Sequence, residues 1–112
     1  MRELEERFLR FSLTCRNYLK SRKWDEVDRV YKIQLARSAG SVGANYIEAN
    51  ENLGKQDLSM HLRISRKEAK ESKYWLQHLD YETDPTNAQL QQEAEAIKRI
   101  LSAIILKLSS SS

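Results

Sequence analysis

Basic side chains recur along one stretch of the chain at spacings that would place them on one face of a helix. Between residues 63 and 73 an arginine or lysine occurs at least every three positions, and most fall within about a third of the helix circumference. A row of this kind can follow a phosphate backbone, and Tyr74 at its margin can stack on a base. The candidate nucleic-acid-binding residues are Arg63, Arg66, Lys67, Lys70 and Lys73.

A solvated helix face explains the same row of charges. The chain has 19 Lys and Arg against 16 Asp and Glu, and a net charge of +3 does not decide between the two interpretations. A second basic region covers the first helical segment and the loop after it. Its members are Arg7, Arg10, Arg16, Lys20, Arg22 and Lys23.

Residues that could support catalysis or bind a metal are few and poorly spaced. Two glutamate pairs are spaced i, i+3: Glu48 with Glu51 and Glu68 with Glu71. Such pairs are usually solvated or ion-paired. Neither His61 nor His78 has a glutamate three residues before it, as a di-iron bundle requires, and the lone Cys15 adds no zinc ligand set. We therefore expect a protein that is not an enzyme, with no catalytic residues, no metal and no cofactor.

Four helical segments must position these side chains. Apolar residues three or four apart predict helices over residues 3–19, 25–52, 55–79 and 87–108. Pro85 disfavours helix at the residue before it, which predicts a loop over residues 80–86. Gly54 is an acceptable N-cap for the third helix, and Leu53 and Leu58 stand at hydrophobic-staple positions around it.

Composition favours helices over strands. The chain has 112 residues, of which 40% are hydrophobic and 31% charged, and only three glycines and one proline are available for turns. We expect an all-α, antiparallel up-down-up-down four-helix bundle as a single domain over residues 1–108, with a disordered serine tail at 109–112. No apolar run approaches the roughly 20 residues of a membrane span, and no signal peptide is recognisable, so we expect a cytoplasmic protein without a membrane partner.

The two middle helices carry small or apolar residues on two faces. A helix in a monomeric bundle buries one stripe, so a second such face predicts a second partner. Gly40 and Gly43 each cost about 1 kcal/mol inside a helix, which close backbone approach can offset. One wide core stripe is the alternative explanation. We predict a homo-oligomer whose interface includes Gly40, Gly43, Ala44, Ile47, Ile64, Glu68 and Trp75.

Two motifs resemble a known family. Residues 37–50, RSAGSVGANYIEAN, resemble the signature of the four-helix bundle proteins associated with 23S rRNA intervening sequences. Residues 67–76, KEAKESKYWL, are similar to that family's second signature, and Asp57-Leu58 to the pair that opens the same helix. Gly54 departs from the family, which often has a serine cap there, and the first loop lacks a proline often found in it.

The resemblance implies a bacterial protein whose antiparallel bundle assembles as a ring-shaped homopentamer without catalytic residues. A related branch, the accessory variability proteins of retroelements, binds nucleic acid and a reverse transcriptase through a basic barrel. By the same resemblance, Asn45 would fix helix register and Tyr74 would help shape subunit contacts.

Two functions stay open at this point. The first is an oligomer that binds RNA or DNA through repeated basic helix faces, with the RNA backbone as the favoured ligand. The second is a protein-interaction scaffold, or an accessory subunit for a reverse transcriptase or another partner, without nucleic-acid specificity of its own.

Overall fold

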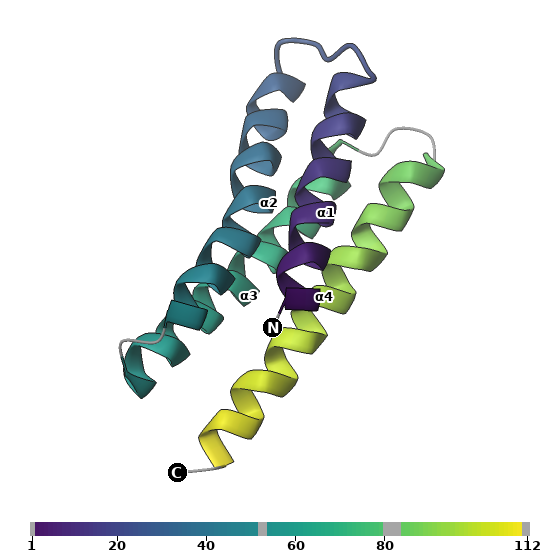
Figure 1. The fold of residues 1–112 in the computed structure, drawn as a ribbon. Helices are drawn as coiled ribbons and strands as arrows, with labels where there is room; N and C mark the ends of the chain where they lie inside the picture. The colour runs from purple at the N-terminus through teal and green to yellow at the C-terminus, as the bar shows by residue number, and fades with distance from the viewer. Residues whose placement is uncertain (1, 52–53, 80–83, 111–112) are drawn as a thin grey trace.

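The computed structural model describes residues 2–51, 54–79 and 84–110 and is helical over nearly all of them (Figure 1). The helices are α1 (Arg2–Lys20), α2 (Asp28–Glu51), α3 (Lys55–His78) and α4 (Pro85–Ser110). No strand occurs in these ranges. The prediction of an all-α protein with four helices is confirmed.

The four helices pack side by side as a bundle of 48 × 22 × 21 Å. α2 packs most extensively against α3, and α3 against α4, whereas α1 contacts α2 and touches α4 least. Figure 1 shows α1 ending and α2 beginning at one end of the molecule, and α2 ending and α3 beginning at the other. None of these described helices is long and apolar enough to cross a lipid bilayer.

The core is built from the apolar stripe of each helix. Phe8 of α1 meets Tyr46 of α2 edge to face, with ring centroids 5.0 Å apart. Between α2 and α3 the seam contains small polar side chains: the Ser38 and Ser72 Oγ atoms lie 2.8 Å apart, and Ser65 Oγ donates to the Val42 carbonyl at 2.7 Å. These serines are fully buried, and their small size allows the close approach of the two helices.

The start of α2 differs from the prediction. The helix begins at Asp28 rather than Asp25, because the Asp25 side chain acts as a cap: its Oδ1 accepts a hydrogen bond from the Asp28 backbone N–H at 2.8 Å. The predicted helix included residues 25–27, which precede α2 in the structure. Val27 is 66% exposed there and does not belong to the core.

The bounds of α4 also differ. We predicted a loop over residues 80–86, of which 80–83 lie outside the described residues. The loop assignment is wrong for residues 85 and 86, because α4 begins at Pro85, where a proline loses no hydrogen bond that the helix would make. Asp84 Oδ1 accepts from the Thr86 N–H at 2.9 Å and caps this helix. At the other end α4 continues through Ser109 and Ser110, which we expected in the disordered tail. The Ser110 hydroxyl donates to the Lys107 carbonyl at 3.0 Å.

The start of α3 agrees with the prediction. Gly54 is the N-cap, with φ of 133°, and its carbonyl accepts from the Leu58 N–H at 3.0 Å. Glycine suits this position because a side chain would strain the backbone there. The expected staple contact between Leu53 and Leu58 lies outside the described residues.

Candidate nucleic-acid interface

The structure separates the five predicted basic residues into two groups. Arg63, Lys67 and Lys70 are exposed on the outer side of α3, followed one turn later by Tyr74, whose side chain is 54% exposed. Within the described ranges none of the three cations has an ion-pair partner, and Arg63 Nε donates only to Ser59 Oγ, at 3.2 Å. We call Arg63, Lys67, Lys70 and Tyr74 the α3 stripe.

The other two basic residues are engaged with α4. Arg66 Nη1 donates to Ser102 Oγ at 3.4 Å, and Lys73 Nζ lies 3.2 Å from Glu95 Oε1. Hydrogen bonds from Lys98 and Lys73 lower the pKa of Glu95. Arg66 and Lys73 therefore join α3 to α4, and their charges are partly committed within the chain.

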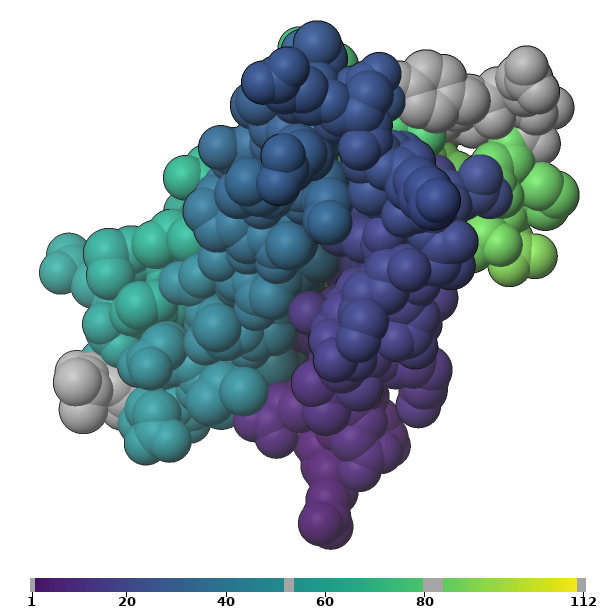
Figure 2. Space-filling model, turned by 90° about the horizontal axis from the view of Figure 1, so that it is seen from above, coloured from purple at the N-terminus to yellow at the C-terminus, as the bar shows by residue number. Residues whose placement is uncertain are grey.

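Three of the predicted interface residues lie on the solvent side of α2. Gly40 and Ala44 are exposed, and Ile47 is 47% exposed. Figure 2 shows α2 beside α1 on one face of the molecule, where α1 adds further exposed apolar side chains. We call this set the outer apolar face: Leu9, Leu13, Ile33, Gly40, Ala44 and Ile47.

Gly43 has a role within the chain. A Cβ added to it would lie 3.5 Å from Phe8 Cβ, so this glycine sits in the contact between α2 and α1. A Cβ on Gly40 would meet only Ser12 Oγ, at 3.8 Å. The structure thus places the two glycines differently: Gly43 toward α1, and Gly40 toward solvent.

Two of the three remaining interface candidates, Glu68 and Trp75, contact α2, whereas Ile64 lines a shallow hollow on α3 itself. Glu68 is buried and pairs with Arg37, whose Nη1 lies 3.4 Å from Glu68 Oε1. Trp75 is half-buried and stacks on Tyr31 with ring centroids 6.0 Å apart, and Ile64 is half-buried as well. The role of Ile64, Glu68 and Trp75 as subunit contacts stays a prediction. Glu68 and Trp75 already have partners within the chain.

Sequence reasoning missed an aromatic cluster at the end of this contact. The His78 ring lies 4.5 Å from Tyr31 and 4.6 Å from Tyr74, measured between centroids, and 5.6 Å from Trp75. The spacing of residues 74, 75 and 78 indicates a shared side of α3. Tyr31 comes from another helix, and no local pattern connects it to them.

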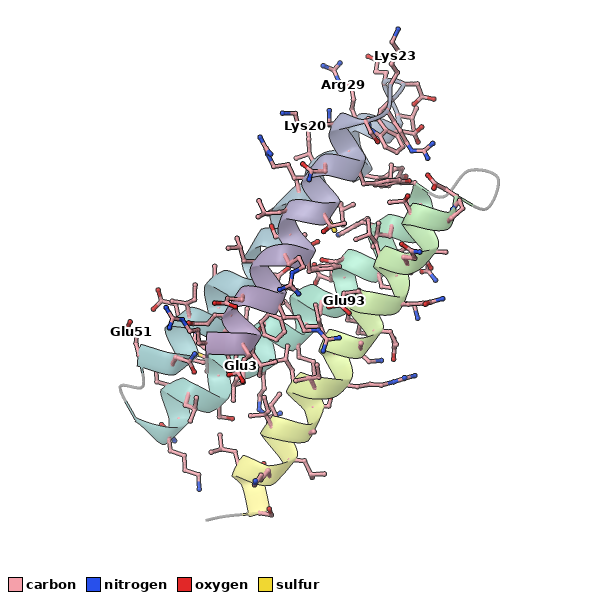
Figure 3. All side chains as sticks on the ribbon, turned by 45° about the vertical axis from the view of Figure 1, so that its right-hand side comes forward. Glu3, Lys20, Lys23, Arg29, Glu51 and Glu93 are labelled. Carbon is pink, nitrogen blue, oxygen red and sulfur yellow. The ribbon has the colours of Figure 1, made fainter. Side chains whose placement is uncertain are left out.

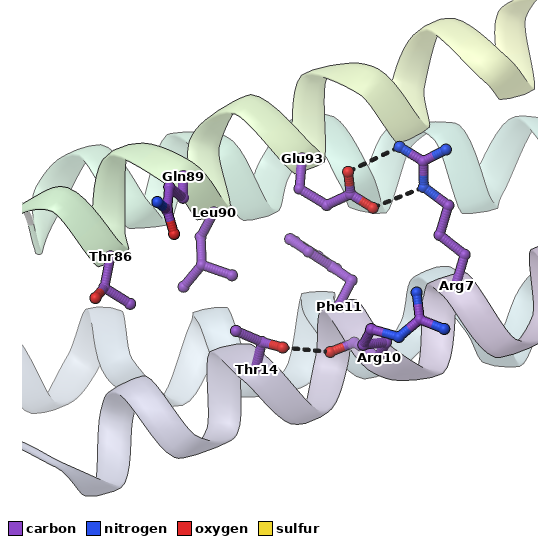
Figure 4. A pocket seen from close by; sticks show the side chains of 8 residues that line it. All are labelled: Arg7, Arg10, Phe11, Thr14, Thr86, Gln89, Leu90 and Glu93. Atoms are coloured by element: carbon purple, nitrogen blue, oxygen red, sulfur yellow. Dashed lines mark hydrogen bonds and ion pairs between the residues drawn. The ribbon is translucent and has the colours of Figure 1, made fainter.

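A groove of about 490 Å³ lies between α1 and α4, which of the helix pairs in contact are the least closely packed (Figure 4). Phe11 and Leu90 point into it, and Arg7 spans it to Glu93 with two hydrogen bonds of 2.8 Å. The hydrogen bond to Glu93 raises the pKa of Arg7. The carboxylate of Glu93 is thus the fixed partner of a cation and is poorly suited to act as a general base.

Residues with metal-binding chemistry stay dispersed over the described part of the chain, where no three His, Cys, Asp or Glu side chains form a possible metal site. His61 lies near one carboxylate, with Nε2 3.5 Å from Asp57 Oδ1, and its Nδ1 is 3.3 Å from Asn45 Oδ1. Cys15 is buried, and burial raises the pKa of its thiol to about 12.

The fold and this surface define the protein as a small four-helix bundle with a row of exposed basic residues on one helix. The family model of the 23S rRNA-intervening sequence proteins matches residues 5–103, and the chain belongs to this family. The family resemblance read from the two sequence motifs is confirmed.

A solved structure supports the assignment. The chain is similar to a crystal structure, at 1.70 Å resolution, of a protein with unknown function from the S23 ribosomal protein family of Bacteroides thetaiotaomicron VPI-5482. The TM-score is 0.77 at 28% sequence identity, and the alignment covers 90% of this chain and 96% of the other. Among curated proteins, none matches this chain.

Proposed function

We propose that the protein is a non-enzymatic homo-oligomer of the bacterial cytoplasm that binds the RNA backbone through the α3 stripe. The observation that carries this proposal is the state of Arg63, Lys67 and Lys70, which are exposed and lack an ion-pair partner among the described residues. Cations in this state can neutralise phosphates without first breaking a bond inside the protein.

The stripe suits a regular polyanion rather than one small ligand. Its cations follow the helix at positions 63, 67 and 70, so they form a row and not a closed pocket. Phosphate contacts of this kind carry little sequence information, so we expect weakly selective binding. Three neutralised phosphates predict a loss of affinity of about 20- to 40-fold between 50 and 200 mM salt.

The proposed assembly is a ring of antiparallel bundles, with five copies favoured. The outer apolar face supports it, because Leu9 is 56% exposed and Ile33 64% exposed on neighbouring helices of a single chain. Contiguous exposed apolar residues mark interaction sites, and a second copy would cover them. Repeating the stripe around a ring would let several copies act on one polyanion.

A triple charge reversal tests the RNA site. We expect R63E/K67E/K70E to lose binding to a labelled RNA duplex in fluorescence anisotropy, while the molar mass of the assembly in light scattering stays that of the wild type. The matched control is R2E/K55E/K107E, which makes the same change of charge at exposed residues away from the stripe. Undiminished binding by the stripe variant would show that the proposed site is wrong.

A second candidate function is a protein-interaction scaffold, such as an accessory subunit for a reverse transcriptase. The outer apolar face favours it as well, because a partner protein could cover the same residues. This alternative predicts negligible RNA affinity at physiological salt and purification with one specific protein. Measurable, salt-sensitive RNA binding by the isolated protein favours the first function.

A further inference from the structure

A second basic surface lies at the end of the bundle where α1 is connected to α2. It surrounds a shallow hollow of about 510 Å³, which we call the tip hollow, lined by Arg22, Lys23, Trp24, Glu26, Arg29 and Lys32. Figure 3 shows Lys23 and Arg29 projecting from this end, with Lys20 nearby, whereas Glu3 and Glu51 lie toward the opposite end. The two ends of the α1–α2 pair therefore differ in charge.

The cations of the tip hollow differ in whether they have an ion-pair partner among the described residues. Arg22 is committed within the chain: it pairs with the buried Asp84, and its guanidinium lies 5.2 Å from the centre of the Tyr18 ring. Lys23, Arg29 and Lys32 have no ion-pair partner in the described ranges. The one carboxylate in the lining is Glu26, so these three cations exceed the acidic charge of the hollow.

Trp24 gives the hollow a fixed aromatic wall. Its Nε1–H donates to the Leu19 carbonyl at 2.8 Å, and its ring meets Tyr18 at 5.8 Å between centroids with an interplanar angle of 64°. These contacts hold the indole in place, while the side chain stays half-buried and borders the hollow. A ring held in this way can stack on a base with little loss of side-chain entropy.

We propose that the tip hollow binds an unpaired nucleotide of a single-stranded nucleic acid. The phosphate lies among Lys23, Arg29 and Lys32, and the base packs on Trp24. A base inside a duplex is stacked on its neighbours and cannot reach the indole, so the site selects unpaired segments. This inference deepens the proposed function by naming the form of nucleic acid, but its site lies on other elements than the α3 stripe.

The two tryptophans of the chain allow a direct test. Protein labelled with 5-fluorotryptophan gives two ¹⁹F resonances, and W24F assigns the one from Trp24. We expect a hexauridine single strand to shift the Trp24 resonance, and a blunt RNA duplex at the same concentration to leave it unchanged. An unshifted Trp24 resonance at saturating hexauridine, or an equal shift with the duplex, overturns the proposal.

Charge variants separate this site from the α3 stripe. We expect K23E/R29E to lower the affinity read from the Trp24 resonance by about tenfold or more, because two phosphate contacts are lost. The control K55E/K107E, at exposed residues of the opposite end, should keep the shift. R63E/K67E/K70E should also keep the Trp24 shift. A wrong assignment of the α3 stripe and a wrong assignment of the tip hollow therefore give different results. A shift retained in K23E/R29E contradicts the proposal.

Discussion

At the residue scale, the row of basic residues could be predicted but the state of each charge could not. Helical spacing placed Lys70 and Lys73 close together on α3. Only the folded chain shows that Lys73 meets Glu95 and that Lys70 has no ion-pair partner among the described residues. Glu95 belongs to α4, and the register between two helices is not encoded in the pattern of either one.

This difference predicts unequal costs of charge reversal. Lys73→Glu places a second carboxylate beside that of Glu95 and should lower the Tm, whereas Lys70→Glu, at an exposed position, should change the Tm little. Circular dichroism melts of the two variants at pH 7 measure the difference. Equal melting temperatures would mean that the Lys73–Glu95 pair does not stabilise the bundle.

The same ion pair predicts a pH dependence. Because hydrogen bonds from Lys98 and Lys73 lower the pKa of Glu95, its contribution to stability is present above the pKa of an unfolded glutamate. That contribution is lost as the pH falls through the lowered pKa. Glu95→Gln should therefore lower the Tm at pH 7 and have a much smaller effect near pH 2, when both are compared with the wild type.

Cys15 predicts a chemical probe of unfolding. Burial raises the pKa of its thiol to about 12, so almost no thiolate is present at pH 8 and the side chain is shielded from reagents. We expect no alkylation by iodoacetamide in buffer and rapid alkylation in guanidinium chloride, followed by mass spectrometry. Fast labelling of the native protein would show that the contact between α1 and the core opens readily.

At the element scale, periodicity predicted all four helices, and its errors lie at their ends. Asp25 and Pro85 decide where α2 and α4 begin, through a side-chain cap and through a first-turn position that tolerates proline. Each is a local exception that a periodic pattern does not detect. The sequence predicted close packing at both Gly40 and Gly43. It could not show that Gly43 packs against α1 while Gly40 is exposed.

Gly43 predicts how tightly α1 and α2 pack. Alanine fits, because its Cβ would lie 3.5 Å from Phe8 Cβ, and it should stabilise the helix by up to about 1 kcal/mol. Leucine extends further toward Phe8 and should destabilise the protein by about 1–3 kcal/mol through overpacking. Urea unfolding of the two variants measures both effects, and a stable Gly43→Leu would contradict the observed α1–α2 contact.

The α1–α4 pair should depend on one ion pair. Arg7 and Glu93 form two hydrogen bonds of 2.8 Å across the groove between these weakly packed helices. A double-mutant cycle of R7A and E93A should give a coupling energy of about 0.5–1 kcal/mol for this half-exposed pair. If the two substitutions change the free energy of unfolding additively, the ion pair does not stabilise the contact between α1 and α4.

At the scale of the whole molecule, the proposed function depends on assembly, which the structure of one chain does not show. The small and apolar residues on two faces of the middle helices predicted a second partner, and the structure leaves Gly40 and Ala44 exposed beside apolar side chains of α1 and α2. Which partner covers them depends on the free energy of association, and neither the periodicity nor the fold of one chain supplies that quantity.

A substitution on the outer apolar face tests the proposed assembly. Gly40→Leu should leave the fold of one chain intact, because a Cβ there meets only Ser12 Oγ at 3.8 Å, and should weaken association by blocking close approach of a second copy. The matched control is Ala103→Leu, at an exposed position of α4. Size-exclusion chromatography with light scattering should give an oligomer for wild type and control. A 13.1 kDa monomer for the wild type at micromolar concentration would refute the assembly.

The salt dependence of RNA binding shows whether the α3 stripe is the RNA site. The slope of log K against log salt counts the phosphates that the protein neutralises. We predict that R63E/K67E/K70E, in any salt range where its binding can still be measured, has a slope smaller in magnitude than that of the wild type by about 2 to 3 for each α3 stripe engaged. The control R2E/K55E/K107E should keep the wild-type slope. Equal slopes for the wild type and the stripe variant would contradict RNA binding through the α3 stripe.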